Sequence, residues 1–346
     1  MSEPLDPTIA EVSPADGMAL RLLEVIQDSL GTVVPDSNAG TGAAPDSSAL
    51  ENEALQESYA FATPKLFNSY GPIEIPPFER IPNFGHVAIA IAIGVVSSLI
   101  SVLLTGAALH LHMFGVSSLE QASSDIRYAL GGQALLYLLT FLGCALIFPH
   151  LWSMGLFAGL QWNGAVLRQR FRLILAAVFF CFTAAILDGA LIPQPKDAPI
   201  DHLFRMPGAP WLLLGFGVTI APFIEEMAFR GFLLPALATA IDWSRERFFD
   251  RARPFSDFNV HPQWSMLAQI IASILTSIPF ALMHAPQNAG SFGSLALMMV
   301  VSLVLCAVRL STRSLAASTV VHACYNMTLF LLMLIGTHGF TNLEKL

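Results

Sequence analysis

The stretch that decides this fold is APFIEEMAFRG, residues 221–231. It places Glu225, Glu226 and Arg230 inside an apolar run that covers residues 211–241. On a helix, Glu226 and Arg230 share a face and can form an ion pair, since they lie four residues apart. Glu225 lies about 100° round the axis and has no local partner. Because an unpaired carboxylate at membrane depth must be neutralised or hydrogen-bonded, we expect another segment to face Glu225.

The composition indicates a membrane protein with several spans. The chain has 346 residues, of which 54% are hydrophobic and 12% are charged, whereas a soluble globular chain is about one-quarter charged. The net charge of −8 comes largely from an acidic N-terminal region, and no basic patch indicates nucleic-acid binding. The cysteines lie in apolar runs without C-x-x-C spacing, which favours packing over disulfides or a thiolate zinc site. They are Cys144, Cys181, Cys306 and Cys324.

Residues 1–84 form a polar N-terminal region that differs from the rest of the chain. We expect no signal peptide at its start, because no basic segment precedes an apolar core. Ser13 and Pro14 predict a helix start, and the apolar spacing that follows predicts a short amphipathic helix. Residues 35–53 are poor in bulky apolar side chains, which predicts disorder. The proline-rich residues 71–82 predict a stiff, extended approach to the membrane.

The apolar runs after this region predict an all-α transmembrane bundle. A bilayer core of about 30 Å needs about 20 helical residues, and we expect seven spans. A patch at 151–162 is too short to span easily and is expected to be interfacial or re-entrant; if it crosses, the count becomes eight. The run 211–241 is too long for one straight crossing, so it must tilt, kink at Pro222 or project beyond the lipid. The predicted spans are 86–109, 131–149, 171–193, 211–241, 265–284, 294–309 and 315–336.

The positions of the arginines agree with seven spans. Three loops carry most of them, and with seven spans these loops lie on one side, which the positive-inside rule makes cytoplasmic. The N-terminus is then inside and the C-terminus outside. We expect an integral membrane protein of the plasma membrane of a bacterium. The three clusters are Arg168, Arg170 and Arg172; Arg245, Arg247, Arg251 and Arg253; and Arg309 and Arg313.

Two later spans carry polar side chains at helical spacing. His284 ends the fifth span one turn after Phe280, and His322 and Asn326 share a face of the last span. Taken singly, such residues usually form hydrogen bonds between helices. Together with the two carboxylates and the arginine, they make a polar set on three successive helical units of otherwise lipid-like sequence.

This set of side chains suits the activation of water. A carboxylate can take a proton from water, and a histidine can polarise that water or bind a metal that does so. A second histidine and an amide can donate hydrogen bonds to the oxyanion that forms when water attacks a peptide carbonyl. The residues therefore indicate hydrolysis within the membrane.

Three motifs in order resemble those of the CPBP family. They are Glu-Glu-x-x-x-Arg from 225, Phe-x-x-x-His from 280 and His-x-x-x-Asn from 322, and the resemblance covers residues 205–336. The family consists of membrane-embedded endopeptidases, the CAAX proteases and bacteriocin-processing enzymes. The resemblance implies a substrate that is a membrane-associated protein or peptide, prenylated in the CAAX-type members. We accordingly divide the membrane part into N-terminal transmembrane helices, 85–204, and a catalytic helical core, 205–340.

The resemblance also implies roles for the motif residues. Glu225 is the general base, and His284 holds or shares the water. His322 and Asn326 stabilise the oxyanion, and the ion pair of Glu226 fixes its helix. Zinc stays open as a cofactor, because two histidines and a glutamate can ligate it with one open position. We favour a metal-free mechanism, since the chain has no His-Glu-x-x-His motif, although the family is commonly called metalloprotease.

Two other classes of protein remain as alternatives. Charged residues and broken helices also mark the transport path of a membrane transporter, but here the polar set lies in the last third of the chain and no matching set occurs earlier. A non-catalytic scaffold or immunity protein on the same fold is the second alternative. The intact motif set argues against it.

Overall fold

The computed structural model describes residues 82–191, 199–206, 208–249, 264–288 and 291–341. Every regular element in these residues is a helix, which confirms the predicted all-α class. The predictions of an amphipathic helix near the N-terminus, of disorder at 35–53 and of an extended proline-rich segment fall outside the described residues, apart from residue 82 at the end of that segment.

Among the residues that the structure describes, seven helical runs are long and apolar enough to cross a bilayer, which confirms the predicted count. Four of them are longer than expected, and two clearly so, because hydropathy marks the lipid-facing length and not the helix ends. One begins at residue 126, where the Asp125 side chain accepts a hydrogen bond from the backbone N–H of Arg127. Another continues past residue 241 as an amphipathic segment. The runs are α4 (Phe84–His110), α6 (Ile126–Trp152), α9 (Phe171–Leu191), the continuous run Ala209–Phe249, α14 (Met266–His284), α15 (Phe292–Thr312) and α16 (Leu315–Gly336).

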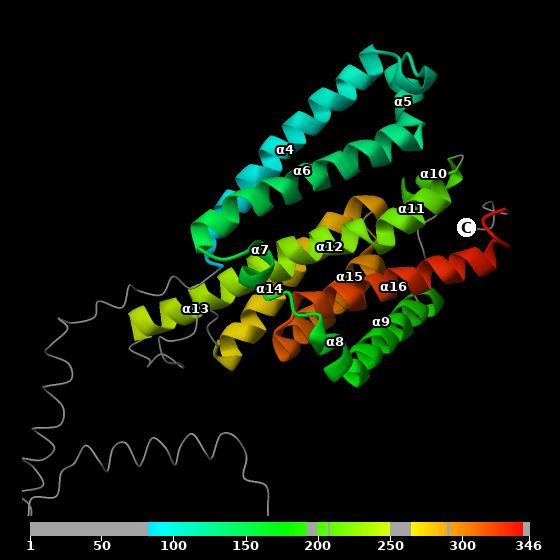
Figure 1. The fold of residues 1–346 in the computed structure, drawn as a ribbon. Coiled ribbons are helices and arrows are strands. Elements are labelled where there is room, and N and C mark those ends of the chain that lie inside the picture. Colours follow the sequence, from blue (N-terminus) through cyan, green and yellow to red (C-terminus); the bar gives the residue numbers. More distant parts are fainter. Residues whose placement is uncertain (1–81, 192–198, 207, 250–263, 289–290, 342–346) are drawn as a thin grey trace, which may run out of the picture. The chain divides into compact units, whose positions relative to one another are not determined.

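The first two spans form a helical hairpin, joined by η1 (Met113–Gly115) and α5 (Leu119–Ser123). Figure 1 shows α4 and α6 running side by side. Small residues allow this close approach, as is common between membrane helices. A Cβ atom on Gly143 would come within 2.6 Å of Ile93 Cγ2, and Ser101 Oγ donates to the carbonyl of Gly132 at 2.7 Å.

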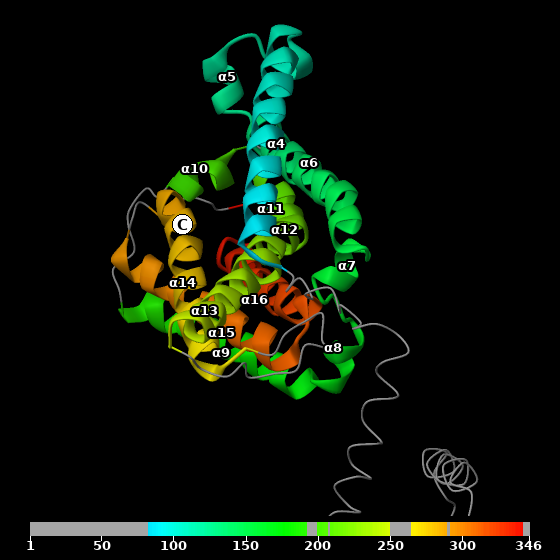
Figure 2. The same ribbon diagram turned by 90° about the vertical axis from the view of Figure 1, so that its left-hand side faces the viewer.

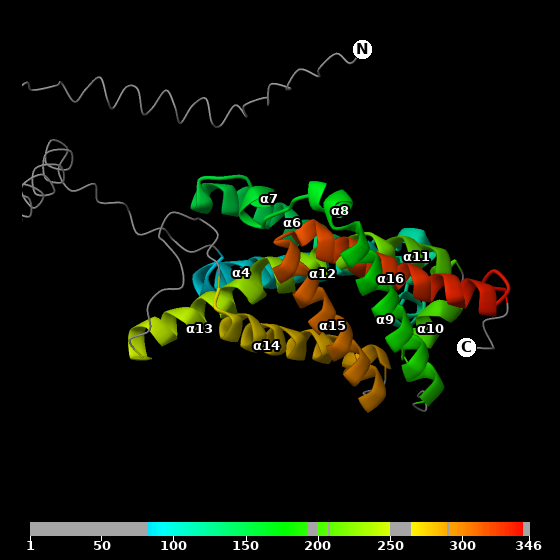
Figure 3. The same cartoon turned by 90° about the horizontal axis from the view of Figure 1, so that it is seen from below.

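The C-terminal spans pack together with α9 and form a second group of helices (Figure 2). α14 packs against both α13 (Leu234–Phe249) and α15, and α9 lies across α15 and α16 (Figure 3). Cys181, Leu305 and Val321 are fully buried where α9, α15 and α16 meet. Cys144, Cys181 and Cys306 are buried free thiols and Cys324 is an exposed one. Two short helices, α8 (Ala165–Gln169) and α10 (Pro199–Arg205), and the turn η3 (Ala285–Asn288) complete this part.

The short apolar patch at 151–162 does not form a spanning helix. Its first residues belong to α6, and the rest form α7 (Leu156–Gly159) and a turn. Leu160 is 1% exposed, and the carbonyl of Gln161 accepts from the backbone N–H of Leu315 at 3.0 Å. Gly231 faces this turn, since a Cβ there would lie 3.2 Å from Leu160 Cδ2. One side of the patch therefore packs into the protein near the start of α16, while Leu151, Phe157 and Trp162 are exposed.

The long run Ala209–Phe249 is broken into four segments. They are α11 (Ala209–Val218), α12 (Ile220–Glu226), the π-helix η2 (Met227–Leu233) and α13. The break falls at Thr219, with φ −116° and ψ −71°, and not at Pro222 itself. Proline lacks an N–H and its ring crowds the preceding turn, so the distortion appears before the ring. The π-helix begins directly after Glu226, and π-bulges are frequent at functional sites.

Candidate active site

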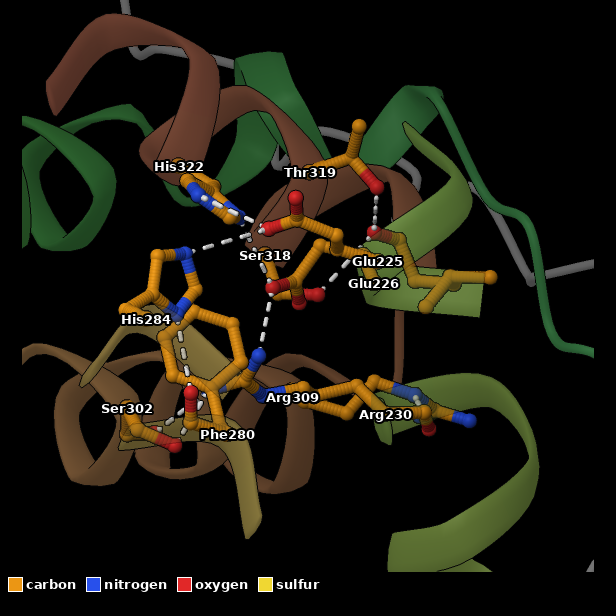
Figure 4. A network of polar contacts seen from close by, with 11 residues as sticks. Glu225, Glu226, Arg230, Phe280, His284, Ser302, Arg309, Ser318, Thr319 and His322 are labelled. Carbon is orange, nitrogen blue, oxygen red and sulfur yellow. Dashed lines mark hydrogen bonds and ion pairs between the residues drawn. The ribbon is translucent and has the colours of Figure 1, made fainter. Parts of the chain in front are cut away.

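Glu225 meets two histidines from later helices (Figure 4). Its Oε2 atom lies 3.9 Å from Nε2 of His284, the last residue of α14, and 3.8 Å from Nε2 of His322 on α16. All three side chains line one cavity. Both distances are too long for a direct hydrogen bond. A single water molecule can reach the carboxylate and one imidazole at normal hydrogen-bond lengths.

The second ring nitrogen of each histidine is held by an acceptor. His284 Nδ1 lies 2.8 Å from the carbonyl oxygen of Phe280, and His322 Nδ1 lies 3.1 Å from Oε1 of Glu226. A carbonyl and a carboxylate only accept, so this network assigns a proton to each Nδ1. The two Nε2 atoms are therefore the positions that exchange protons or hydrogen bonds in front of Glu225.

Phe280 explains the spacing of the Phe-x-x-x-His motif. One helical turn puts its carbonyl under His284, and its ring lies 4.8 Å from the His284 ring and 5.8 Å from the His322 ring, between centroids. The guanidinium carbon of Arg230 lies 4.4 Å from the centroid of the same ring. Phe280 is 1% exposed, so it is the apolar centre around which the charged groups are arranged.

The ion pair expected between Glu226 and Arg230 is present and completely buried. Arg230 Nη1 lies 2.8 Å from Glu226 Oε1, and neither side chain is exposed. Arg230 Nη2 also donates to the hydroxyl and the carbonyl oxygen of Ser302, at 2.7 and 3.0 Å. Glu226 Oε1 thus accepts from both Arg230 and His322. The link from Glu226 to His322 is not visible in the sequence, because it joins residues 96 positions apart.

Arg309, which the sequence predicts in a loop, is a buried part of this network. It lies inside α15 and is 3% exposed. Its Nε donates to the carbonyl of Arg230 at 3.3 Å and its Nη2 to the carbonyl of Leu160 at 3.4 Å. The expected third arginine cluster therefore keeps only Arg313, which is exposed. The sequence does contain one indication of this burial. Arg309 ends an apolar helical run, and an ionisable residue in such a run usually faces the protein interior.

Two carboxylates and two guanidinium groups thus lie close together in the core of the bundle, and their formal charges cancel. An isolated buried charge costs far more than a paired one. Arg309 and Arg230 are linked through the Arg230 carbonyl, and Arg230 is paired with Glu226. This balance allows Glu225 and Glu226 to be adjacent in sequence within a membrane span.

Asn326 lines the same cavity but makes a different contact. Its Nδ2 donates to the carbonyl of Gly217 on α11 at 2.7 Å. This bond joins α16 to α11 just before the break at Thr219, and it uses one of the two amide hydrogens. The structure therefore brings all six predicted site residues into one region, with Asn326 held by a backbone carbonyl.

The cavity has a volume of about 640 Å³. It is lined from α6, α10, α11, α12, α14, α15 and α16. Away from Glu225 and the histidines, most of its wall is apolar. The polar side chains on this wall include Gln133, Tyr137, Tyr325 and Asn326.

The donor set does not fit a metal ion. Among the residues that the structure describes, no group of three or more His, Cys, Asp and Glu side chains is arranged to hold one. The distances from Glu225 to the two imidazoles exceed the separation of neighbouring ligands on a zinc ion bound at about 2.0–2.2 Å. We therefore derive no catalytic step through a metal.

The seven apolar helices are those of an integral membrane protein, and one cavity in their bundle is lined by a carboxylate and two histidines. Residues 207–328 match the family described as Rce1-like, type II CAAX prenyl endopeptidase Rce1-like. The three motifs lie within this match, which confirms the resemblance to the CPBP family of intramembrane proteases. Searches of curated proteins and of solved structures each gave no match.

Proposed function

We propose that this chain is an intramembrane endopeptidase in which Glu225 activates the water that hydrolyses a peptide bond. The observation that carries the proposal is the convergence of His284 Nε2 and His322 Nε2 on Glu225 Oε2, at 3.9 and 3.8 Å. The family match supports a membrane-associated protein or peptide of CAAX type as substrate. The apolar cavity wall supports a substrate with an apolar or prenylated segment. We assign catalysis to the core 205–340 and the protein to the plasma membrane of a bacterium.

In the first step, water donates one hydrogen to Glu225 Oε2 and one to His284 Nε2. The water oxygen forms a bond to the carbonyl carbon of the scissile peptide as its proton passes to Glu225. The electron pair of the carbonyl double bond moves to the oxygen, which becomes an oxyanion. His284 is assigned this role because its Nε2 lies 3.9 Å from Glu225 Oε2, so that one water can form hydrogen bonds to both atoms.

The oxyanion needs hydrogen-bond donors that are already in place. His322 is the first, because Glu226 holds its Nδ1 and leaves Nε2 directed toward the cavity. With a proton on Nε2, this imidazole donates to the oxyanion. The second amide hydrogen of Asn326 is the other donor, since the first is bound to Gly217. As the C–N bond breaks, Glu225 returns its proton to the leaving amine.

The experiment uses the full chain in nanodiscs and a fluorescent peptide with a farnesylated CAAX C-terminus. We expect the wild type to cleave the peptide, with mass spectrometry locating the cleaved bond. Glu225→Ala, His284→Ala and His322→Ala should each lower the rate by at least about 100-fold, the usual contribution of a positioned acid or base. Membrane insertion should stay as in the wild type. Equal rates for Glu225→Ala and the wild type would reject the proposal.

A second measurement separates this function from the alternatives. Membrane proteins from cells with the wild type and with Glu225→Ala are compared by mass spectrometry for altered C-terminal or leader fragments. A changed fragment set identifies the substrate. An unchanged set together with altered solute uptake would indicate a transporter, and an unchanged set with unaltered uptake would indicate a non-catalytic scaffold or immunity protein.

A further inference from the structure

Tyr137 brings a polar side chain to the site from outside the matched region. It lies on α6, whereas the family match covers residues 207–328. Its side chain lines the same cavity as Glu225. The phenol interacts with the Glu225 carboxylate and with the side chain of Gln133, one turn earlier on α6. No motif in the sequence marks Tyr137, since a tyrosine in an apolar helix is an ordinary packing residue.

Aromatic contacts fix the ring of Tyr137 in front of Glu225. The ring stacks on Phe216 of α11, with centroids 5.6 Å apart and planes 19° from parallel. One turn further along α6, Phe141 meets Phe223 of α12 edge to face, with centroids 5.5 Å apart. Both partners of the second contact lie further toward the C-terminus than those of the first. The two contacts together therefore set the position of α6 along the α11–α12 segment. Two packed pairs therefore decide where the phenol lies relative to the carboxylate.

We propose that Tyr137 donates a hydrogen bond to Glu225 and so positions the carboxylate for water activation. The inference rests on the proposed function of Glu225 as general base. Glu225 is the largely buried carboxylate that faces the cavity, with a side chain 13% exposed. A buried carboxylate needs donors, and both histidines present Nε2, which donates only when it carries a proton. The phenol is a donor in either state of the histidines.

The role of Tyr137 in this arrangement is positioning, because it acts through Glu225 and not on the scissile bond. If the phenol holds one carboxylate oxygen of Glu225, the other oxygen stays directed at the position of the attacking water near the two histidines. Without the phenol, Glu225 samples other rotamers, and a smaller fraction of bound substrate meets a correctly placed base. The expected effect is on kcat, with substrate binding unchanged.

The test compares Tyr137→Phe with the wild type on the farnesylated fluorescent peptide in nanodiscs. We expect kcat to fall about 10-fold, in keeping with the loss of a hydrogen bond to a charged group, and KM to change less than about twofold. Tyr128→Phe is the matched control on the same helix, because its phenol donates to the carbonyl of Met113 at 3.0 Å and does not line the cavity. Its kcat should equal that of the wild type.

Two further variants separate the hydroxyl from the ring. Tyr137→Leu removes both, and we expect the same kcat as for Tyr137→Phe; a loss confined to the Leu variant would overturn the proposal in favour of packing. In a Glu225→Asp background the carboxylate is withdrawn from the phenol, so adding Tyr137→Phe should cause little further loss. If the fold-losses in kcat of the two single variants multiply in the double variant, Tyr137 does not act through Glu225.

The outcomes also distinguish this inference from the proposed function. If the wild type and Glu225→Ala behave alike, the proposed function fails, and this inference fails with it. If the wild type cleaves, Glu225→Ala does not, and Tyr137→Phe has the kcat of the wild type, only the role of Tyr137 is rejected. A raised KM at unchanged kcat would also reject positioning, and would assign Tyr137 to substrate binding.

Discussion

Glu226 and His322 are joined directly, with His322 Nδ1 3.1 Å from Glu226 Oε1. The same oxygen accepts from Arg230 Nη1 at 2.8 Å. The carboxylate that balances the buried arginine is therefore also the group that orients a site histidine. Under the proposed function, this one oxygen contributes to both stability and catalysis, and substitutions around it should separate the two effects.

The substitution Glu226→Gln keeps the size of the side chain but replaces one acceptor oxygen with a donor. We expect a loss in kcat of at least about 100-fold, because an amide can present its N–H to His322 and favour the wrong tautomer. Cleavage of the farnesylated peptide by purified, membrane-inserted protein is the measurement. Glu120→Gln, at an exposed position in α5, is the control with wild-type activity. More than half of wild-type kcat in Glu226→Gln would show that His322 needs no such partner.

The substitution Arg230→Ala should act mainly on folding. It leaves Glu226 unpaired in a site with no exposure, and breaking a buried ion pair typically costs about 3–5 kcal/mol. We expect a low folded yield and a reduced thermal midpoint in detergent. Arg127→Ala is the matched control, because the Arg127 side chain is 48% exposed in its pair with Asp125, and solvent screens such pairs. A normal midpoint for Arg230→Ala would mean that Glu226 has another source of compensation.

The substitution Arg309→Met removes the donor for two carbonyl groups, those of Arg230 in the π-helix and of Leu160 after α7. An unsatisfied buried acceptor costs about 1–3 kcal/mol, so the thermal midpoint should fall. The rate should fall as well, because the π-helix begins at the residue after Glu226. Arg313→Gln, four positions later and exposed, should change neither quantity. If both variants resemble the wild type, Arg309 does not hold the π-helix.

The sequence predicts the seven spans because a bilayer sets both the length and the composition of a crossing helix. It also predicts six residues of the candidate site, since the members of each motif lie about one helical turn apart and the ionisable residues lie in otherwise apolar runs. The Glu226–Arg230 pair is predictable for the same reason, because its two members share one helix face.

Contacts between distant segments are the part that the sequence does not reveal. The bond between Glu226 and His322, the burial of Arg309 and the approach of Tyr137 all depend on how helices are shifted and tilted against one another. His284 ends α14 whereas His322 lies near the start of α16, and counting residues from the span ends does not place them at one depth. The π-helix at Met227–Leu233 was likewise not predicted from the sequence.

Removal of metal ions should leave the cleavage activity nearly unchanged. Among the residues that the structure describes, no group of three or more His, Cys, Asp and Glu side chains could hold a metal ion, and Glu225 Oε2 lies 3.9 and 3.8 Å from the two Nε2 atoms, farther than neighbouring ligands on a zinc ion. We therefore expect cleavage of the farnesylated peptide to stay within about twofold after treatment with 1,10-phenanthroline and removal of the chelator, since general-base activation of water needs no Lewis acid. Mass spectrometry of the purified protein should find zinc below one ion per chain. Loss of activity that added zinc restores would contradict this prediction and make Glu225 and the two histidines a metal centre.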